Sequence, residues 1–164
     1  MFKKTVFYRR ERREDAEGKE INFQNVNQIT DAVIGAAIEV HKKLSPGLLE
    51  SAYKECLTRE FVLREINFER EKPLPLEYKG IRLECGYRLD FLIEKLVVVE
   101  IKSVDALNSI HESQLITYLR FGEWKIGLLI NFNVEKLTNG IRRRVLNYKE
   151  YLLLPSASPP RSLR

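Results

Sequence analysis

Three charged residues lie in a stretch that otherwise has the composition of a buried hairpin. Asp90, Glu100 and Lys102 belong to LDFLIEKLVVVEIKS (residues 89–103), where most of the other side chains are apolar. Burying an unpaired charge is costly, so these side chains need partners. Two interpretations are open at this point: a structural ion pair that steadies a strand, or a pair of carboxylates that bind a metal ion.

The turn between the two expected strands decides whether the carboxylates can meet. A two-residue turn at Glu94-Lys95 would place Asp90 opposite Val99, on the wrong face of the hairpin. A three-residue loop or a bulge would place Asp90 opposite Glu100. Glu100 and Lys102 share a face because side chains alternate along a strand. A metal site therefore requires an odd loop or a bulge.

Two adjacent carboxylates repel each other, so that one becomes protonated or a cation is recruited. Mg²⁺, or Mn²⁺ in its place, binds to one or two carboxylates together with water and phosphate oxygens. Such an ion polarises a phosphodiester and lowers the pKa of a bound water. A neighbouring lysine can orient that water or stabilise the developing charge. On the spacing alone, the structural ion pair remains the simpler interpretation.

The rest of the chain indicates one domain. We expect it at residues 24–153, between a charged, flexible N-terminal extension (1–23) and a flexible tail rich in Pro and Ser (154–164). The net charge of +5 is compatible with an anionic partner such as nucleic acid. Cys56 and Cys85 match no metal or disulfide spacing, which favours reduced thiols in a cytoplasmic protein. No apolar run is long enough for a membrane span.

The hydrophobic pattern predicts an α/β (α+β mixed) fold with helices flanking a central mixed sheet. Helices are expected at 29–44, capped by Thr30 or Asp31, at 48–65 and at 109–122. Residues 66–95 alternate as an antiparallel meander with a turn near 78–80, and Pro73 and Pro75 indicate an edge strand. Strands at 96–104 and 125–132, joined by a helix, predict a parallel crossover. Residues 134–147 are expected to form a turn and a short helical or extended piece.

This pattern resembles the PD-(D/E)xK nuclease superfamily, which carries an Asp at the end of one strand and Glu-x-Lys on the next. GLLESAY (47–53) matches the G-x-x-E-x-x-Y motif of the GxxExxY family of small bacterial proteins within that superfamily. CGYRLDFLI, EIKSV, HESQLITYLR and GLLINFN also resemble its blocks, and the likeness covers about residues 28–146. The proline of the superfamily name has no clear counterpart before Asp90. The resemblance implies a restriction-endonuclease-like core.

The resemblance also implies roles for individual residues. Asp90 and Glu100 would be metal ligands, with the main-chain carbonyl of Ile101 as a third, and Lys102 would be the catalytic lysine. Glu50 resembles a helical acidic residue that assists the metal site through water. In addition, Gln114-x-x-x-Tyr118 resembles a Q-x-x-x-Y element that helps to hold the substrate backbone.

Several neighbours of these residues are candidate substrate contacts with open alternatives. His111, Gln114 and Tyr118 fall on one face of a helix, and His111 could contact substrate or cap that helix. Tyr53 and Tyr118 could contact substrate or be half-buried core aromatics. Arg142 and Arg143, next to Arg144 and near Tyr148, could track a phosphate backbone or belong to an exposed helix face or strand edge.

Together, the motifs favour a metal-dependent nuclease that acts on nucleic acid, with DNA preferred over RNA as the substrate. The alternative is a catalytically inactive module of the same fold that binds nucleic acid or a protein. A small structural protein with an ion pair is the third hypothesis. A protein partner or a homodimer is compatible with a compact core that lacks a recognition domain, and no membrane contact is expected.

Overall fold

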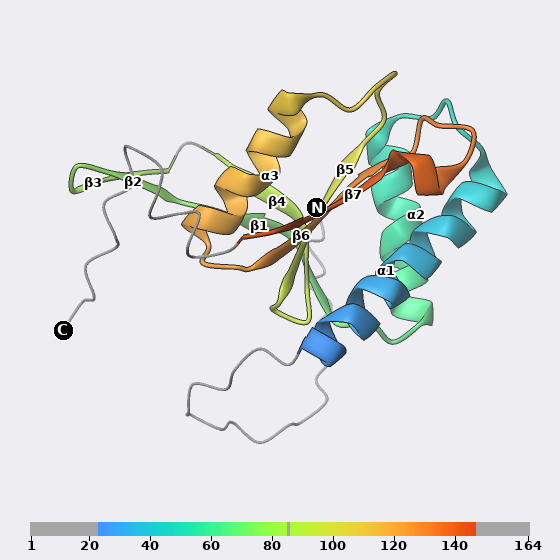
Figure 1. The fold of residues 1–164 in the computed structure, drawn as a ribbon, viewed down its shortest axis with the longest axis horizontal. Coiled ribbons are helices and arrows are strands. Elements are labelled where there is room, and N and C mark those ends of the chain that lie inside the picture. The colour runs from blue at the N-terminus through green and yellow to red at the C-terminus, as the bar shows by residue number, and fades with distance from the viewer. Residues whose placement is uncertain (1–22, 85, 147–164) are drawn as a thin grey trace, which may run out of the picture.

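The computed structural model describes residues 23–84 and 86–146, which form a central sheet between two layers of helices (Figure 1). Helices α1 (Phe23–Leu44) and α2 (Glu50–Leu63) cover one face, and α3 (Ser109–Phe121) covers the other. The terminal extensions predicted to be flexible lie outside the described residues. Within the described part, no helix is both long and apolar enough to cross a membrane.

The main sheet is mixed, as the sequence predicts. Its five strands have the order β1-β4-β5-β6-β7, with only the β5–β6 pair parallel among the described strands. The strands are β1 (Phe68–Pro73), β4 (Arg88–Ile93), β5 (Val97–Lys102), β6 (Ile126–Asn131) and β7 (Ile141–Val145). Helix α3 connects β5 to β6, which confirms the predicted crossover. Strand β1 lies at an edge, where its Pro73 costs no ladder bond to a further strand.

The predicted meander is divided in two. Strands β2 (Leu76–Tyr78) and β3 (Ile81–Leu83) pair only with each other and extend away from the main sheet (Figure 1). Their turn, Lys79-Gly80, has positive φ at both residues (49° and 81°), as tight hairpins with two-residue turns require. Strand β1 instead pairs directly with β4. Pro73 at the end of β1 and Pro75 just after it thus separate the projecting hairpin from the sheet that carries the candidate site.

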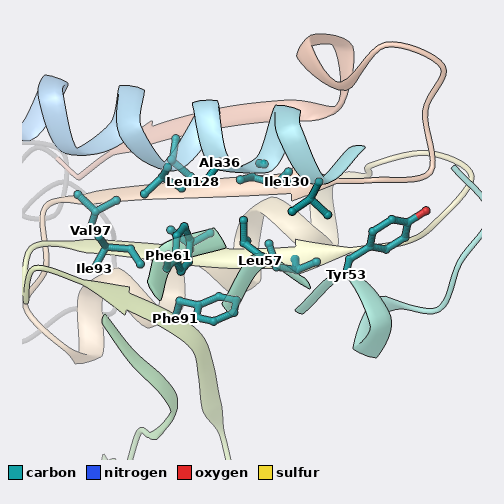
Figure 2. Packing of buried hydrophobic residues seen from close by; sticks show 14 of the residues in the cluster. Ala36, Tyr53, Leu57, Phe61, Phe91, Ile93, Val97, Leu128 and Ile130 are labelled. Carbon is teal, nitrogen blue, oxygen red and sulfur yellow. The ribbon is translucent and has the colours of Figure 1, made fainter. Parts of the chain in front are cut away.

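Alternate residues of the buried strands enter two different cores. Val97, Val99 and Ile101 pack beneath α1 and α2, where Figure 2 shows the packing around Leu57, Phe61 and Phe91, whereas Val98 packs beneath α3. This explains the run of consecutive apolar residues in β5, which is buried on both faces.

Strand β6 carries a glycine beneath α3. A Cβ on Gly127 would lie 2.7 Å from Cδ1 of Leu115, too close for any real contact. The glycine therefore lets Leu115 of α3 pack closely against the sheet.

Two local predictions need correction. Helix α1 begins at Phe23, so Thr30 lies inside it, buried, with its hydroxyl donating to the carbonyl of Asn27 (2.9 Å); neither Thr30 nor Asp31 is the N-cap. The helix starts earlier because Val26, only 2% exposed, extends the apolar stripe by another turn. Helix α2 is shorter than predicted at both ends. The prediction for residues 134–147 is confirmed, because a 3₁₀ turn, η1 (Leu137–Gly140), is followed there by the extended strand β7.

Candidate active site

A three-residue turn joins β4 to β5. Ile93 pairs with Val97, which leaves Glu94, Lys95 and Leu96 in the loop. Glu94 and Lys95 have φ values of 49° and 60°, and the Leu96 amide donates to the Ile93 carbonyl (2.9 Å). The prediction of an odd loop is confirmed, and with it the register that sets Asp90 level with Glu100.

Strands β4 and β5 diverge beyond Phe91 and Val99, the last pair of their ladder. From there β4 continues along β1, while β5 continues along β6. Side chains bridge the opening: the Asp90 amide donates to Oε1 of Glu100 (3.3 Å), and the Ile101 amide donates to Oδ2 of Asp90 (2.8 Å). We call this opening the fork. It brings both carboxylates to the point where the two strands separate.

Burial perturbs the acid chemistry of the fork. Asp90 and Glu100 are only 8% and 3% exposed. Burial, and then the charge of Asp90, raise the pKa of Glu100 to about 8, although Lys102, the Asp90 amide and Lys54 act in the opposite direction. Glu100 is therefore largely protonated at neutral pH in the metal-free protein. Lys102 lies on the same strand, with Nζ 3.8 Å from Oε2 of Glu100.

A second lysine reaches the fork from helix α2. Nζ of Lys54 lies 2.5 Å from Oδ1 of Asp90 and 2.7 Å from Oε1 of Glu50. Burial acts to lower the pKa of Lys54, but the hydrogen bonds and charges of Asp90 and Glu50 outweigh burial and hold this pKa above its ordinary value. Sequence reasoning missed this residue. The only signal was its position four residues after Glu50, and nothing local shows that this helix face meets Asp90.

Helix α3 supplies the polar residues on the other side of the sheet. Nε2 of Gln114 donates to the hydroxyl of Tyr118 (2.7 Å), and the Tyr118 ring makes an edge contact with Tyr87 (6.3 Å between centroids). Burial raises the pKa of Tyr118 and the Gln114 hydrogen bond opposes this, while the charges of Glu100 and Asp90 raise it further. Tyr118 is therefore close enough to the fork for its hydroxyl to be affected by the charges there, and Gln114 is hydrogen-bonded to that hydroxyl.

His111 and Tyr53 have structural partners. Nδ1 of His111 accepts from the Asn108 amide (3.2 Å) in a capping box at the start of α3, so the capping alternative is the one observed. Tyr53 is completely buried; its hydroxyl donates to the Ser45 carbonyl (2.7 Å) and accepts from the Leu48 amide (3.1 Å). In Figure 2 this hydroxyl points away from the labelled cluster. Full burial gives Tyr53 a structural role in place of the predicted substrate contact.

The three arginines of β7 do not form one patch. Side chains alternate along the strand, and Arg143 donates to Oδ1 of Asn27 on α1 (2.8 Å), whereas Arg144 pairs with Glu112 on α3. Arg142 donates to nearby main-chain carbonyls. The strand-edge alternative therefore describes these residues, and Arg142 and Arg143 cannot grip one phosphate from the same face. Tyr148 lies outside the described residues.

The oxygen donors at the fork suit a hard divalent cation. Among the described residues, no group of three or more His, Cys, Asp or Glu side chains is gathered closely enough to hold a metal ion. This argues against a closed, zinc-like site there. Asp90, Glu100 and a main-chain carbonyl are ligands of the kind that Mg²⁺ prefers, because this ion binds to one or two carboxylates and retains several waters or phosphate oxygens.

Comparison with known proteins agrees with this geometry. A family model described as the PD-(D/E)XK nuclease superfamily matches residues 27–144, most of the chain. The matched segment includes the fork, Lys102, Glu50 and the Gln114 helix. No curated protein and no solved structure gives a significant match.

Proposed function

The chain belongs to the PD-(D/E)XK nuclease superfamily, and on this premise we propose that it is a metal-dependent nuclease that hydrolyses phosphodiester bonds of nucleic acid, DNA in preference to RNA. The observation that carries the proposal is the fork, where two nearly buried carboxylates meet beside Lys102. Membership of the GxxExxY family is part of the proposal, because Gly47, Glu50 and Tyr53 match its motif. A cytoplasmic location is also proposed, from the cysteine pattern.

The metal in this proposal is Mg²⁺ or Mn²⁺. Asp90, Glu100 and the main-chain carbonyl of Ile101 would hold it. When bound, such an ion supplies polarisation of the phosphodiester and a lower pKa for a bound water. The donor set fits this ion because it offers hard oxygens and leaves room for water and phosphate.

Other side chains of the chain would orient the reactants. Lys102 is poised to donate to a water or a phosphate oxygen, since its side chain is 13% exposed and its Nζ is 3.8 Å from Glu100. Glu50, at the first turn of α2, would hold a water beside the fork. Gln114 and Tyr118 would contact the substrate backbone from α3. His111, in addition to capping α3, and Arg142, on strand β7, would contact the substrate further along its backbone.

A cleavage assay tests the proposal directly. The full chain is incubated with single- and double-stranded DNA and RNA, with Mg²⁺ or Mn²⁺ and with chelator. We expect cleavage only with metal, its loss in Glu100→Gln and Lys102→Met, and wild-type cleavage by Glu39→Gln, a change on α1 away from the fork. If wild type and Glu100→Gln degrade every substrate equally, the proposal is wrong.

The alternative, a non-catalytic binding module, has one observation in its favour. Nζ of Lys54 lies 2.5 Å from Oδ1 of Asp90, so the protein itself supplies a cation that compensates this charge. Retarded migration of nucleic acid in a gel, with no cleavage in any metal, would support this alternative. Formation of a homodimer, or binding to a protein partner, would support the protein-binding form of this alternative.

A further inference from the structure

Lys54 holds the position at Asp90 that a metal ion would need. Its Nζ lies 2.5 Å from Oδ1 of Asp90, and the Lys54 side chain is only 18% exposed. The other oxygen of Asp90 accepts from the Ile101 amide at 2.8 Å. Both oxygens of this carboxylate are therefore engaged, one of them by a cation that belongs to the protein.

An ammonium and a divalent ion cannot share Asp90 without cost. Like charges in contact with one carboxylate repel, and the repulsion is strong in a site shielded from water. The lysine ammonium is a compact charge that a carboxylate binds well in the absence of metal. Metal entry therefore requires Lys54 to withdraw from Oδ1.

The structure also provides a place for Lys54 to withdraw to. Glu50 lies one helical turn earlier on α2, and its Oε1 is 2.7 Å from Nζ of Lys54. The lysine stem is flexible, so the ammonium can leave Asp90 while it stays paired with Glu50. Lys102 differs in this respect, because it approaches Glu100 at 3.8 Å and leaves Asp90 clear.

We propose that Lys54 is an exchangeable counter-ion of Asp90, which neutralises the fork in the metal-free protein and is displaced when a divalent ion binds. The inference rests on the proposed function, because it concerns the same carboxylates. Lys54 is a positioning residue in this account. It keeps an empty fork compatible with folding, and it weakens metal binding by competing for Asp90.

Direct measurement of Mn²⁺ binding tests the competition. The full chain and its Lys54→Met variant are titrated with Mn²⁺ in a calorimeter at one fixed pH. We expect the variant to bind Mn²⁺ about tenfold more tightly or better, since a competing unit charge is removed. The matched control is Lys43→Met, which removes a lysine paired to Glu39 one turn away on α1 (3.9 Å) and should leave the affinity unchanged.

Further variants keep the test decisive if Lys54→Met folds poorly. Lys54→Gln retains a donor for Asp90 without the charge and should also bind Mn²⁺ more tightly, whereas Lys54→Arg should bind it no better than wild type. Mn²⁺ should raise the melting temperature of Lys54→Gln more than that of wild type.

The possible outcomes separate the two proposals. This inference is overturned if folded Lys54→Gln binds Mn²⁺ no more tightly than wild type. The nuclease proposal stays intact in that case if wild type binds Mn²⁺ and Asp90→Asn does not. No Mn²⁺ binding by wild type or by either neutral variant overturns both.

Discussion

The two ends of the β4–β5 hairpin use the same strands and hold them together by different means. At the turn end, apolar residues pair through the main chain, from Ile93 opposite Val97 to Phe91 opposite Val99, and all are essentially inaccessible to solvent. At the fork, the ladder ends and hydrogen bonds between carboxylates and main-chain amides replace it.

A sheet can bury charges at one end when its other end is held together by apolar packing. The apolar end sets the register and contributes stability, because its side chains pack in both cores. The carboxylates at the fork are poorly solvated and only partly neutralised by lysines. They do not disturb the pairing register of β4 and β5, because the apolar end fixes it. Stability and chemistry are thus concentrated at opposite ends of one hairpin.

The sharpest test of this contrast removes a charge at the fork. Asp90→Asn and Glu100→Gln should each reduce metal-dependent cleavage about a thousandfold, because each removes an anionic metal ligand. The expected change in melting temperature is small. Leu92→Met, a substitution of similar volume toward the turn end, should keep cleavage near the wild-type rate in the same assay. A cleavage rate unchanged in both fork variants would contradict the assignment of the site.

The converse change is made at the turn end. Ile93 is completely buried, so Ile93→Ala should lower the free energy of unfolding by about 3 kcal/mol in urea denaturation. Cleavage per folded molecule should not change, since the substitution lies three residues from Asp90 on the strand. A large loss of activity in fully folded Ile93→Ala would show that the two ends are not separable.

The fork should also make stability depend on pH. Burial and Asp90 raise the pKa of Glu100 to about 8, above its ordinary value of 4.5, so between these values the folded state binds the proton more tightly than the unfolded state. The stabilisation is fully present below about pH 4.5 and is lost as the pH rises through about 8. From about pH 5 to 8 we expect a loss on the order of 3 kcal/mol without metal.

Urea denaturation at several pH values measures this dependence. Glu100→Gln should flatten it, because the amide does not titrate. Glu94→Gln, in the turn of the same hairpin, serves as the control and should retain the wild-type slope. If the free energy of unfolding of Glu100→Gln depends on pH as strongly as that of wild type, a group other than Glu100 causes the dependence.

The smallest expected effects distinguish two tyrosines. Tyr53→Phe removes two hydrogen bonds in the loop before α2 and should cost about 1 kcal/mol of stability with cleavage unchanged. Tyr118→Phe removes the partner of Gln114 beside the fork and should slow cleavage several-fold at similar stability. If Tyr53→Phe were the variant with slower cleavage, the structural role inferred from its burial would be wrong.

Much of the fold follows from local patterns. The paired prolines predicted the edge strand, Gly122 predicted the end of α3, and the apolar runs predicted the strands joined by the parallel crossover. These succeed because periodicity and backbone restrictions act over a few residues. The predicted start of α1 was too late in the chain. Val26 is buried because it belongs to a core cluster that includes residues of the distant sheet, and no local pattern shows this.

The identity and spacing of Asp90, Glu100 and Lys102 can be read from the amino-acid sequence alone, together with the condition that an odd turn must join their strands. The rest depends on the tertiary structure. It provided the three-residue loop, opened the strands at the fork, and brought Lys54 from a helix more than thirty residues earlier to Asp90. No local pattern encodes that last contact, because which helix face meets which strand depends on the packing of the whole core.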